Sequence, residues 1–226
     1  MNMNMFEQFA SPEFLSIPTF TLSMLIPVMM INHKPGLIGN RTTTATIWLL
    51  KKIMSNMTNQ LTITGQKWSS PLISLMIMIL LSNTLGLLPY TYTTTSQLSM
   101  NMALALPFWA ATVATGMLKK PTATLAHMLP EGSPTPLIPF MIMIETVSLL
   151  MRPIALGVRL TANITAGHLL MTMVSSAILS LFNSYAIISI ITMTILFLLT
   201  LLELAVACIQ AYVFVLLLIL YLQENT

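Results

Sequence analysis

Residues 137–182 decide the fold, and they read LIPFMIMIETVSLLMRPIALGVRLTANITAGHLLMTMVSSAILSLF. As one helix with a rise of ~1.5 Å per residue, this run of 46 mostly apolar residues would extend roughly 69 Å. The hydrocarbon core of a bilayer is only about 30 Å thick, so such a helix cannot stand upright in it. We therefore expect the segment either to break near Pro153 or Gly157, or to cross a membrane at a steep tilt.

Polar and ionisable side chains are embedded in this run, namely Glu145, Arg152, Arg159, Asn163 and His168. Such groups are costly at membrane depth, and where they occur they usually serve a function. A polar break at 183–185 separates this run from a second long apolar segment, residues 186–222, which contains Glu203 and Gln210. Both segments are therefore candidates for the functional part of the chain.

The composition excludes a soluble globular protein. Hydrophobic residues make up 56% of the chain and charged residues only 7%, and the mean hydropathy is +0.85. The apolar runs are far longer than the alternating strands of a barrel, and a backbone in lipid must satisfy its own hydrogen bonds. We predict an all-α polytopic membrane protein that forms one integral membrane domain over residues 1–226.

Neither a metal nor a cofactor is expected. The single cysteine, Cys208, excludes a thiolate cluster, and the 20 methionines are scattered without the repeated register of a copper site. No glycine-rich phosphate loop is present, so we expect no bound nucleotide and no chemical active site in this chain. The net charge of +3 comes without a basic patch interleaved with aromatic residues, which argues against a nucleic-acid partner.

Hydropathy and proline positions divide the chain into five predicted membrane crossings and one surface helix. A short polar N-terminal segment, residues 1–13, comes first. Residues 42–57 mix apolar side chains with Lys51 and Lys52, a pattern typical of an amphipathic helix that lies on a membrane surface. The predicted crossings are residues 14–31, 71–88, 98–118, 137–182 and 186–222.

The basic residues predict the orientation. With five crossings, the positive-inside rule assigns the basic side and the C-terminus to the cytoplasm or to its equivalent, the mitochondrial matrix. Two crossings within residues 137–182 would move the C-terminus to the other side, so the rule favours one crossing without proving it. Seven of the nine basic residues then share a side, namely Lys34, Arg41, Lys51, Lys52, Lys67, Lys119 and Lys120.

We predict that the last two segments are long, strongly tilted helices, and that they form an antiparallel hairpin that turns near residue 184 or 185. Residues whose numbers sum to about 370 then lie level, which pairs Arg159 with Gln210 and His168 with Glu203. Small residues allow another helix backbone to approach closely, so we expect Arg159 to face a protein partner rather than lipid. The small residues on its stripe are Ala155, Ala162 and Ala166.

The residue types indicate proton chemistry. A guanidinium stays charged at physiological pH, so Arg159 is suited to act as a fixed cation and not as a proton shuttle. At about 4 Å and an effective dielectric constant of about 20, it would favour the ionised form of a neighbouring acid by ~4 kcal/mol. Proton relay is the expected role of His168, Glu203 and Glu145, with polar support from Asn163 and Gln210.

A structural interpretation stays open for each of these residues. Arg159 could form a buried salt bridge with Glu203 or Glu145, although such pairs stabilise proteins poorly. Arg152 precedes Pro153 and could bond the carbonyls that a kink frees, which we weigh at least equally with a catalytic role. His168 could be a hydrogen-bonded core residue, and interhelical hydrogen bonds could explain the two amides, Asn163 and Gln210.

Two stretches resemble the subunit a family of F-type ATP synthases. Residues 145–168 read ETVSLLMRPIALGVRLTANITAGH, with the motif Arg–Leu–x–x–Asn at 159–163, and residues 202–212 read LELAVACIQAY. The resemblance covers the whole chain and includes YTTTSQ at 92–97. His at 168 and Glu at 203 are similar to the arrangement in mitochondrial members.

The resemblance implies two tilted helices packed along a rotating ring of c subunits, each of which carries a proton-binding carboxylate. Protons would pass from the intermembrane space past His168 and Glu203, with Asn163 and Gln210 nearby, to the ring. They would leave on the matrix side past Glu145. Arg159 would separate these two half-channels, so that proton flow requires rotation of the ring and is coupled to ATP synthesis.

It also implies the mitochondrial inner membrane, with the N-terminus on the intermembrane-space side and the C-terminus on the matrix side. Peripheral-stalk and accessory membrane subunits would be partners besides the c-ring and lipid, and nucleotide chemistry would occur in other subunits.

Three rival interpretations predict other patterns. A self-contained channel or transporter predicts internal repeats, which we do not find, because the polar residues crowd into the last 80 positions. A haem-binding subunit needs paired intramembrane histidines, whereas His168 is the one histidine within a predicted crossing. A passive structural scaffold leaves Arg159 unexplained.

Overall fold

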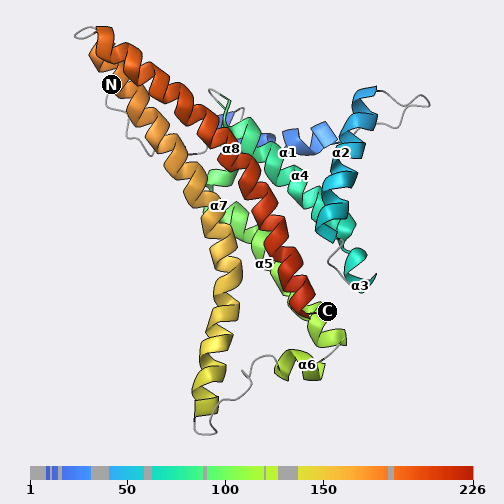
Figure 1. The fold of residues 1–226 in the computed structure, drawn as a ribbon. Coiled ribbons are helices and arrows are strands. Elements are labelled where there is room, and N and C mark those ends of the chain that lie inside the picture. Colours follow the sequence, from blue (N-terminus) through green and yellow to red (C-terminus); the bar gives the residue numbers. More distant parts are fainter. Residues whose placement is uncertain are drawn as a thin grey trace. The chain divides into compact units, whose positions relative to one another are not determined.

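The structure is a computed structural model of the full chain, and it is dominated by helices (Figure 1). It divides into two compact units. Unit 1 comprises Met1–Asn32, Met78–Met100 and Arg159–Tyr212, and unit 2 comprises His33–Ile77, Asn101–Val158 and Val213–Thr226. We describe each unit by itself. The described residues are 9–10, 12–14, 17–31, 41–58, 63–88, 91–119, 121–126, 137–182 and 186–225.

The prediction of an all-α polytopic membrane protein is confirmed by the helices. Four of the described helices are long and apolar enough to cross a membrane. These are α4 (Ser69–Gly86), α5 (Leu98–Lys119), α7 (Ile138–Phe182) and α8 (Ala186–Asn225). The shorter helices are α1 (Thr19–Ile31), α2 (Arg41–Thr58), α3 (Ile63–Gln66), η2 (Thr94–Ser96) and α6 (Pro121–Ala126).

The decisive segment forms one helix. α7 contains Pro153 and continues through it for 45 residues in all, so of the two alternatives the unbroken helix is observed. Pro153 and its neighbour Leu156 are buried. A β-carbon added to Gly157 would lie 2.6 Å from Sδ of Met102, so the absence of a side chain there lets α5 and α7 approach closely in unit 2.

The first predicted crossing, residues 14–31, differs from the structure in its start. α1 begins at Thr19, and two short strands precede it, β1 (Glu13–Phe14) and β2 (Ile17–Pro18), which pair antiparallel. Proline disfavours helical geometry at the residue before it and has no N–H to donate, which explains why Ile17 and Pro18 lie outside the helix. The 13 residues of α1 extend roughly 20 Å, less than a hydrocarbon core.

The predicted surface helix at 42–57 corresponds to α2 in unit 2. Its apolar side chains Ile47, Trp48 and Leu49 are exposed, whereas Met54 and Met57 are buried. The ammonium group of Lys52 lies 4.9 Å from the ring centroid of Trp48, a cation–π arrangement. Its position on a membrane surface stays a prediction.

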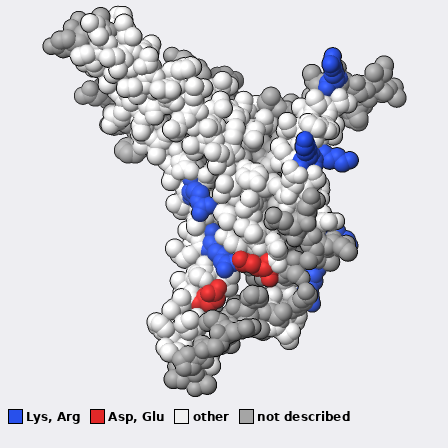
Figure 2. Space-filling model, viewed as in Figure 1, with Lys and Arg blue, Asp and Glu red and all other residues white. Residues whose placement is uncertain are grey.

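Each unit has an apolar core, and the two longest helices, α7 and α8, contribute buried side chains to these cores. In unit 1 the buried side chains include Leu160 and Ile164 of α7 and Ala207 and Ala211 of α8. In unit 2 the last turns of α8 contribute the buried residues Phe214, Val215, Leu218, Ile219 and Leu222. On the face drawn in Figure 2, most of the described surface carries no charge, as expected for a chain whose helices face lipid or protein.

Several predicted features lie outside the described residues. They are the hairpin turn at 183–185, the basic residues Lys34 and Lys120, and the loop histidines His33 and His127.

Candidate functional site

In unit 1, α7 and α8 lie side by side and antiparallel, and their polar residues meet in two pairs (Figure 1). His168 Nε2 lies 3.9 Å from Glu203 Oε1. One turn away on α7, Asn163 Nδ2 donates a hydrogen bond to Gln210 Oε1 at 2.9 Å. The hairpin register predicted from the sequence therefore places His168 and Glu203 correctly at one level.

The same register was wrong about the partner of Gln210. The sequence rule places Gln210 level with Arg159, whereas in the structure the amide of Gln210 bonds to Asn163, four residues further along α7. A polar side chain without a hydrogen-bond partner is costly in an apolar environment. The bond between these two amides satisfies a donor of Asn163 and an acceptor of Gln210 and so lowers that cost for both.

Glu203 is a buried acid with few partners. The residue is 5% exposed, and neither of its carboxylate oxygens has a hydrogen-bond partner among the described residues. His168 Nε2 is also buried without such a partner in the described part of the chain, and 3.9 Å is too long for a hydrogen bond. Buried polar groups in this condition do not stabilise a fold, so this His168–Glu203 pair is a candidate for proton chemistry.

Gly167 makes room for this acid. A β-carbon built at Gly167 would lie 2.6 Å from Glu203 Oε1 and 3.0 Å from Glu203 Cδ. The carboxylate of α8 therefore packs against the backbone of α7, next to His168. The sequence analysis missed this role of Gly167, and its one signal was a glycine directly before an intramembrane histidine.

Arg159 has an exposed side chain on α7, and the nearby small residues Ala162 and Ala166 are also exposed. It forms no ion pair with any residue that the structure describes in unit 1, and Glu203 faces His168 instead. The alternative of a structural salt bridge between Arg159 and Glu203 is therefore wrong. The small residues beside this exposed cation would let another helix approach it closely.

In unit 2, Arg152 is the centre of a charged cluster. Its Nη2 lies 3.8 Å from Glu145 Oε1 of the same helix, and its Nη1 donates a hydrogen bond to Glu224 Oε2 of α8. The guanidinium also lies over the ring of Tyr221, 5.1 Å from the centroid. We call these four residues the Arg152 cluster. The interpretation of Arg152 as a ligand of kink carbonyls is replaced by carboxylate pairing, and the sequence analysis missed both Glu224 and Tyr221.

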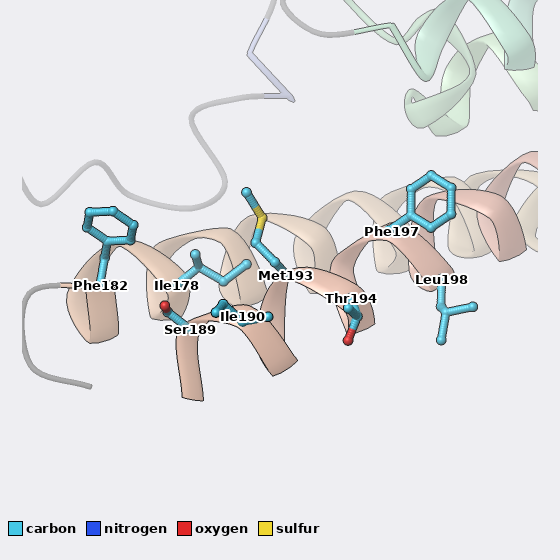
Figure 3. Close-up of a pocket in the computed structure, with 8 residues that line it drawn as sticks. All are labelled: Ile178, Phe182, Ser189, Ile190, Met193, Thr194, Phe197 and Leu198. Carbon is cyan, nitrogen blue, oxygen red and sulfur yellow. The ribbon is translucent and has the colours of Figure 1, made fainter. Parts of the chain in front are cut away.

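The hairpin end of unit 1 contains an apolar pocket of about 610 Å³ (Figure 3). No charged side chain lines this pocket, so it offers nothing for proton transfer. In the described part of the chain, no group of three His, Cys, Asp or Glu residues could hold a metal ion. The lining residues come from the end of α7 and the start of α8 and are Ile178, Phe182, Ser189, Ile190, Met193, Thr194, Phe197 and Leu198.

Comparison with known proteins gives a consistent family. A family model described as ATP synthase A chain matches residues 14–223. The chain is 74% identical to ATP synthase F(0) complex subunit a of Lycodon semicarinatus over 226 residues, which cover all of both chains. It is 57% identical to the protein of the same name from Struthio camelus and 50% identical to that from Scyliorhinus canicula, again over the whole of each chain.

Proposed function

The chain belongs to the ATP synthase A chain family, and we propose that it conducts protons through two offset half-channels beside a rotating ring of c subunits. Its general role in proton translocation by the membrane F0 sector follows from the family. The proposal adds the route of the protons and the residues that carry them.

Arg159 is the observation that carries the proposal. An exposed guanidinium on an apolar helix, without an ion pair among the described residues of unit 1, needs a partner of opposite charge from elsewhere. At about 4 Å and an effective dielectric constant of about 20, the guanidinium of Arg159 would favour the ionised form of a ring carboxylate by ~4 kcal/mol. The acid then gives up its proton, and the fixed charge blocks direct passage between the half-channels.

The His168–Glu203 pair, with Asn163 and Gln210, supports a route of proton uptake from the intermembrane space. Histidine and glutamate can each hold and release a proton, and both atoms that face each other are buried without hydrogen-bond partners in the described residues. A proton shared between them would pass to a ring carboxylate. Glu145 would accept the proton that leaves the ring toward the matrix.

Tight coupling follows from this separation, because protons reach the second route only after the ring has turned. The chain would lie in the mitochondrial inner membrane, with its N-terminus toward the intermembrane space and its C-terminus toward the matrix. Peripheral-stalk and accessory subunits would hold it against the ring, and nucleotide chemistry would occur in other subunits. A self-contained channel is disfavoured, because its cation would line a path within one chain rather than the exposed face of α7.

The test replaces Arg159 by alanine in vesicles that contain the assembled ATP synthase. We expect ATP-driven proton pumping to be lost and passive proton conductance to rise, because no fixed charge then separates the two routes. Lys119→Ala, which removes an exposed cation at the end of α5, is the matched control and should leave both measurements unchanged. Retained coupled pumping in the Arg159→Ala variant would overturn the proposal.

A further inference from the structure

We propose that α2 binds anionic phospholipids, with Lys51 and Lys52 on the headgroup phosphates and Ile47 and Trp48 against the start of the acyl chains. The sequence predicts a membrane-surface helix at 42–57, but it names neither the lipid class nor the residues that contact it. The site uses none of the residues of the proposed proton route, so it stands or falls independently of that route.

One side of α2 is packed and the other is free. Met54 and Met57 are buried, whereas Ile47 is 62% exposed and Trp48 is 63% exposed. Trp48 and Met57 are nine positions apart, which places them on opposite sides of a helix with 3.6 residues per turn. The two methionines therefore mark the side of α2 that packs against protein, and Trp48 lies on the side that remains accessible.

The accessible side combines lysines with apolar side chains at helical spacing. Lys51 follows Ile47 by four positions and Lys52 follows Trp48 by four, so each lysine lies one turn beyond an exposed apolar residue. The second of these pairs is in contact, since the ammonium group of Lys52 lies 4.9 Å from the ring centroid of Trp48. A lysine stem can cover apolar surface while its ammonium group reaches a headgroup.

The charge of α2 is entirely positive. In Figure 2 the basic side chains at α2 protrude from the surface, and no acidic side chain of the described residues is drawn beside them. In the described part of unit 2, the acids Glu145 and Glu224 are paired with Arg152 instead. An anionic partner would therefore meet no competing carboxylate from the described chain. The charged residues of α2 are all exposed and are Arg41, Lys51 and Lys52.

A phospholipid surface fits both the charge and the apolar side chains. Tryptophan is enriched at headgroup level, and a basic helix with exposed apolar residues binds there more strongly when the lipids are anionic. Free phosphate would meet only the lysines and would leave Ile47 and Trp48 in water. α2 ends at Thr58 and the apolar helix α4 begins at Ser69, so at most about 40 Å of chain separates α2 from a membrane span.

The experiment places the assembled ATP synthase in phosphatidylcholine vesicles that contain one photoreactive lipid. This lipid is either phosphatidylglycerol, which is anionic, or phosphatidylcholine, which has no net charge, and both carry the same photoreactive acyl chain. Mass spectrometry measures the labelling of α2, and we expect more labelling by phosphatidylglycerol. In the Lys51→Gln/Lys52→Gln variant this preference should fall roughly 20-fold, because each lysine near an anionic surface strengthens binding about fivefold.

Three further variants separate charge from apolar contact. Lys51→Arg/Lys52→Arg keeps both charges and should keep the preference for the anionic lipid. Trp48→Ala should lower labelling by both lipids to a similar extent, because it removes apolar contact and no charge. Lys119→Gln, which removes an exposed cation at the end of α5, is the matched control and should leave the labelling of α2 unchanged.

The preference can also be tested without a substitution. Raising the salt concentration from 0.15 M to about 1 M shortens the Debye length from about 8 Å to about 3 Å, so the preference of the unmodified complex for the anionic lipid should weaken. The amount of each variant in the assembled complex is measured in parallel.

Two results would overturn the proposal directly, namely equal labelling of α2 by both lipids in the unmodified complex and an undiminished preference in Lys51→Gln/Lys52→Gln. Absence of labelling together with crosslinks from α2 to an acidic segment of another subunit would overturn it as well, because a protein would then occupy the surface. Coupled pumping in Arg159→Ala would remove the proposed half-channels and would leave the lipid site of α2 untouched.

Discussion

The His168–Glu203 pair and the Arg152 cluster both place a carboxylate where α7 meets α8, but they treat it differently. Glu203 is 5% exposed and has no hydrogen-bond partner among the described residues. Glu145 and Glu224 are far more exposed, and both are paired with one cation. A buried acid without a permanent counterion holds a proton and releases it only to a neighbouring group, whereas exposed acids exchange protons with water easily. In the proposed mechanism, this difference would make uptake the controlled step and leave the exit open to water.

The largest expected effect comes from removing the buried acid. We expect Glu203→Gln to lower ATP-driven pumping by at least about 100-fold, since a positioned acid or base contributes that much to a proton transfer. Glu224→Gln should lower ATP-driven pumping only about threefold, because water and Glu145 remain available to the proton. Pumping is measured in vesicles with the assembled complex.

Passive conductance provides a second measurement for Glu203→Gln. It should stay low, because Arg159 still separates the half-channels. Faster, uncoupled proton flow would contradict the placement of Glu203 in the uptake route, and equal effects of the two substitutions would remove the contrast between the two clusters.

A smaller effect is expected from crowding the buried acid. Gly167→Ala places a β-carbon 2.6 Å from Glu203 Oε1, so the carboxylate must move away from His168. We expect about tenfold slower pumping with normal assembly, because overpacking costs roughly 1–3 kcal/mol and acts on the reacting group. The measurement is pumping per assembled complex.

Gly157→Ala is the matched control for Gly167→Ala. Its β-carbon would also meet a side-chain atom at 2.6 Å, but that atom is Sδ of Met102, which belongs to a flexible apolar side chain in unit 2. We expect this substitution to change the amount of assembled complex more than the rate per complex. Equal rates for both variants would show that the position of Glu203 does not limit proton uptake.

Removing the amide pair should have a more modest effect. Asn163→Ala deletes the 2.9 Å hydrogen bond to Gln210 and leaves a buried acceptor unpaired, which costs about 1–2 kcal/mol. We expect pumping to fall by about fivefold without a leak. Ser176→Ala is the control, because this exposed serine of α7 donates its hydrogen bond to Met173 O of its own helix, so its removal should not alter pumping.

The smallest expected effect concerns Tyr92 of unit 1, whose titration tests how burial acts on a phenol group. Burial raises the pKa of Tyr92 above its ordinary value of 10.0, and a hydrogen bond from the side chain of Gln97 lowers it in part. Gln97→Ala removes the lowering contribution, so the pKa should rise further. Difference absorbance between wild-type and Tyr92→Phe proteins isolates this titration, and a fall in pKa would contradict the assignment of causes.

Much of the helical framework could be predicted from the sequence. The predicted segments 98–118 and 137–182 each differ from the observed helices α5 and α7 by one residue at one end. Long apolar runs identify such helices from the local sequence alone. The start of α1 was missed because Pro18 interrupts an otherwise apolar run, and hydropathy does not register a missing N–H.

One part of the candidate site could be predicted from the sequence, namely the pairing of His168 with Glu203 across the two long helices. The hairpin rule placed His168 opposite Glu203 but misassigned Gln210, since a shift of one helical turn changes the partner without changing the pattern of apolar residues. The same rule would place residue 218 rather than Glu224 opposite Arg152. Long side chains reach past their level, so Glu224 could have been suspected only as the last acidic residue of the chain.

The amino-acid sequence by itself determined that this protein is a bundle of membrane helices with ionisable groups inside two of them, because hydropathy and length act locally along the chain. Only the tertiary structure decided which of these groups meet. Asn163 and Gln210, or Arg152 and Glu224, are brought together by the register of α7 against α8, and a register is set by side-chain packing between segments remote in the chain.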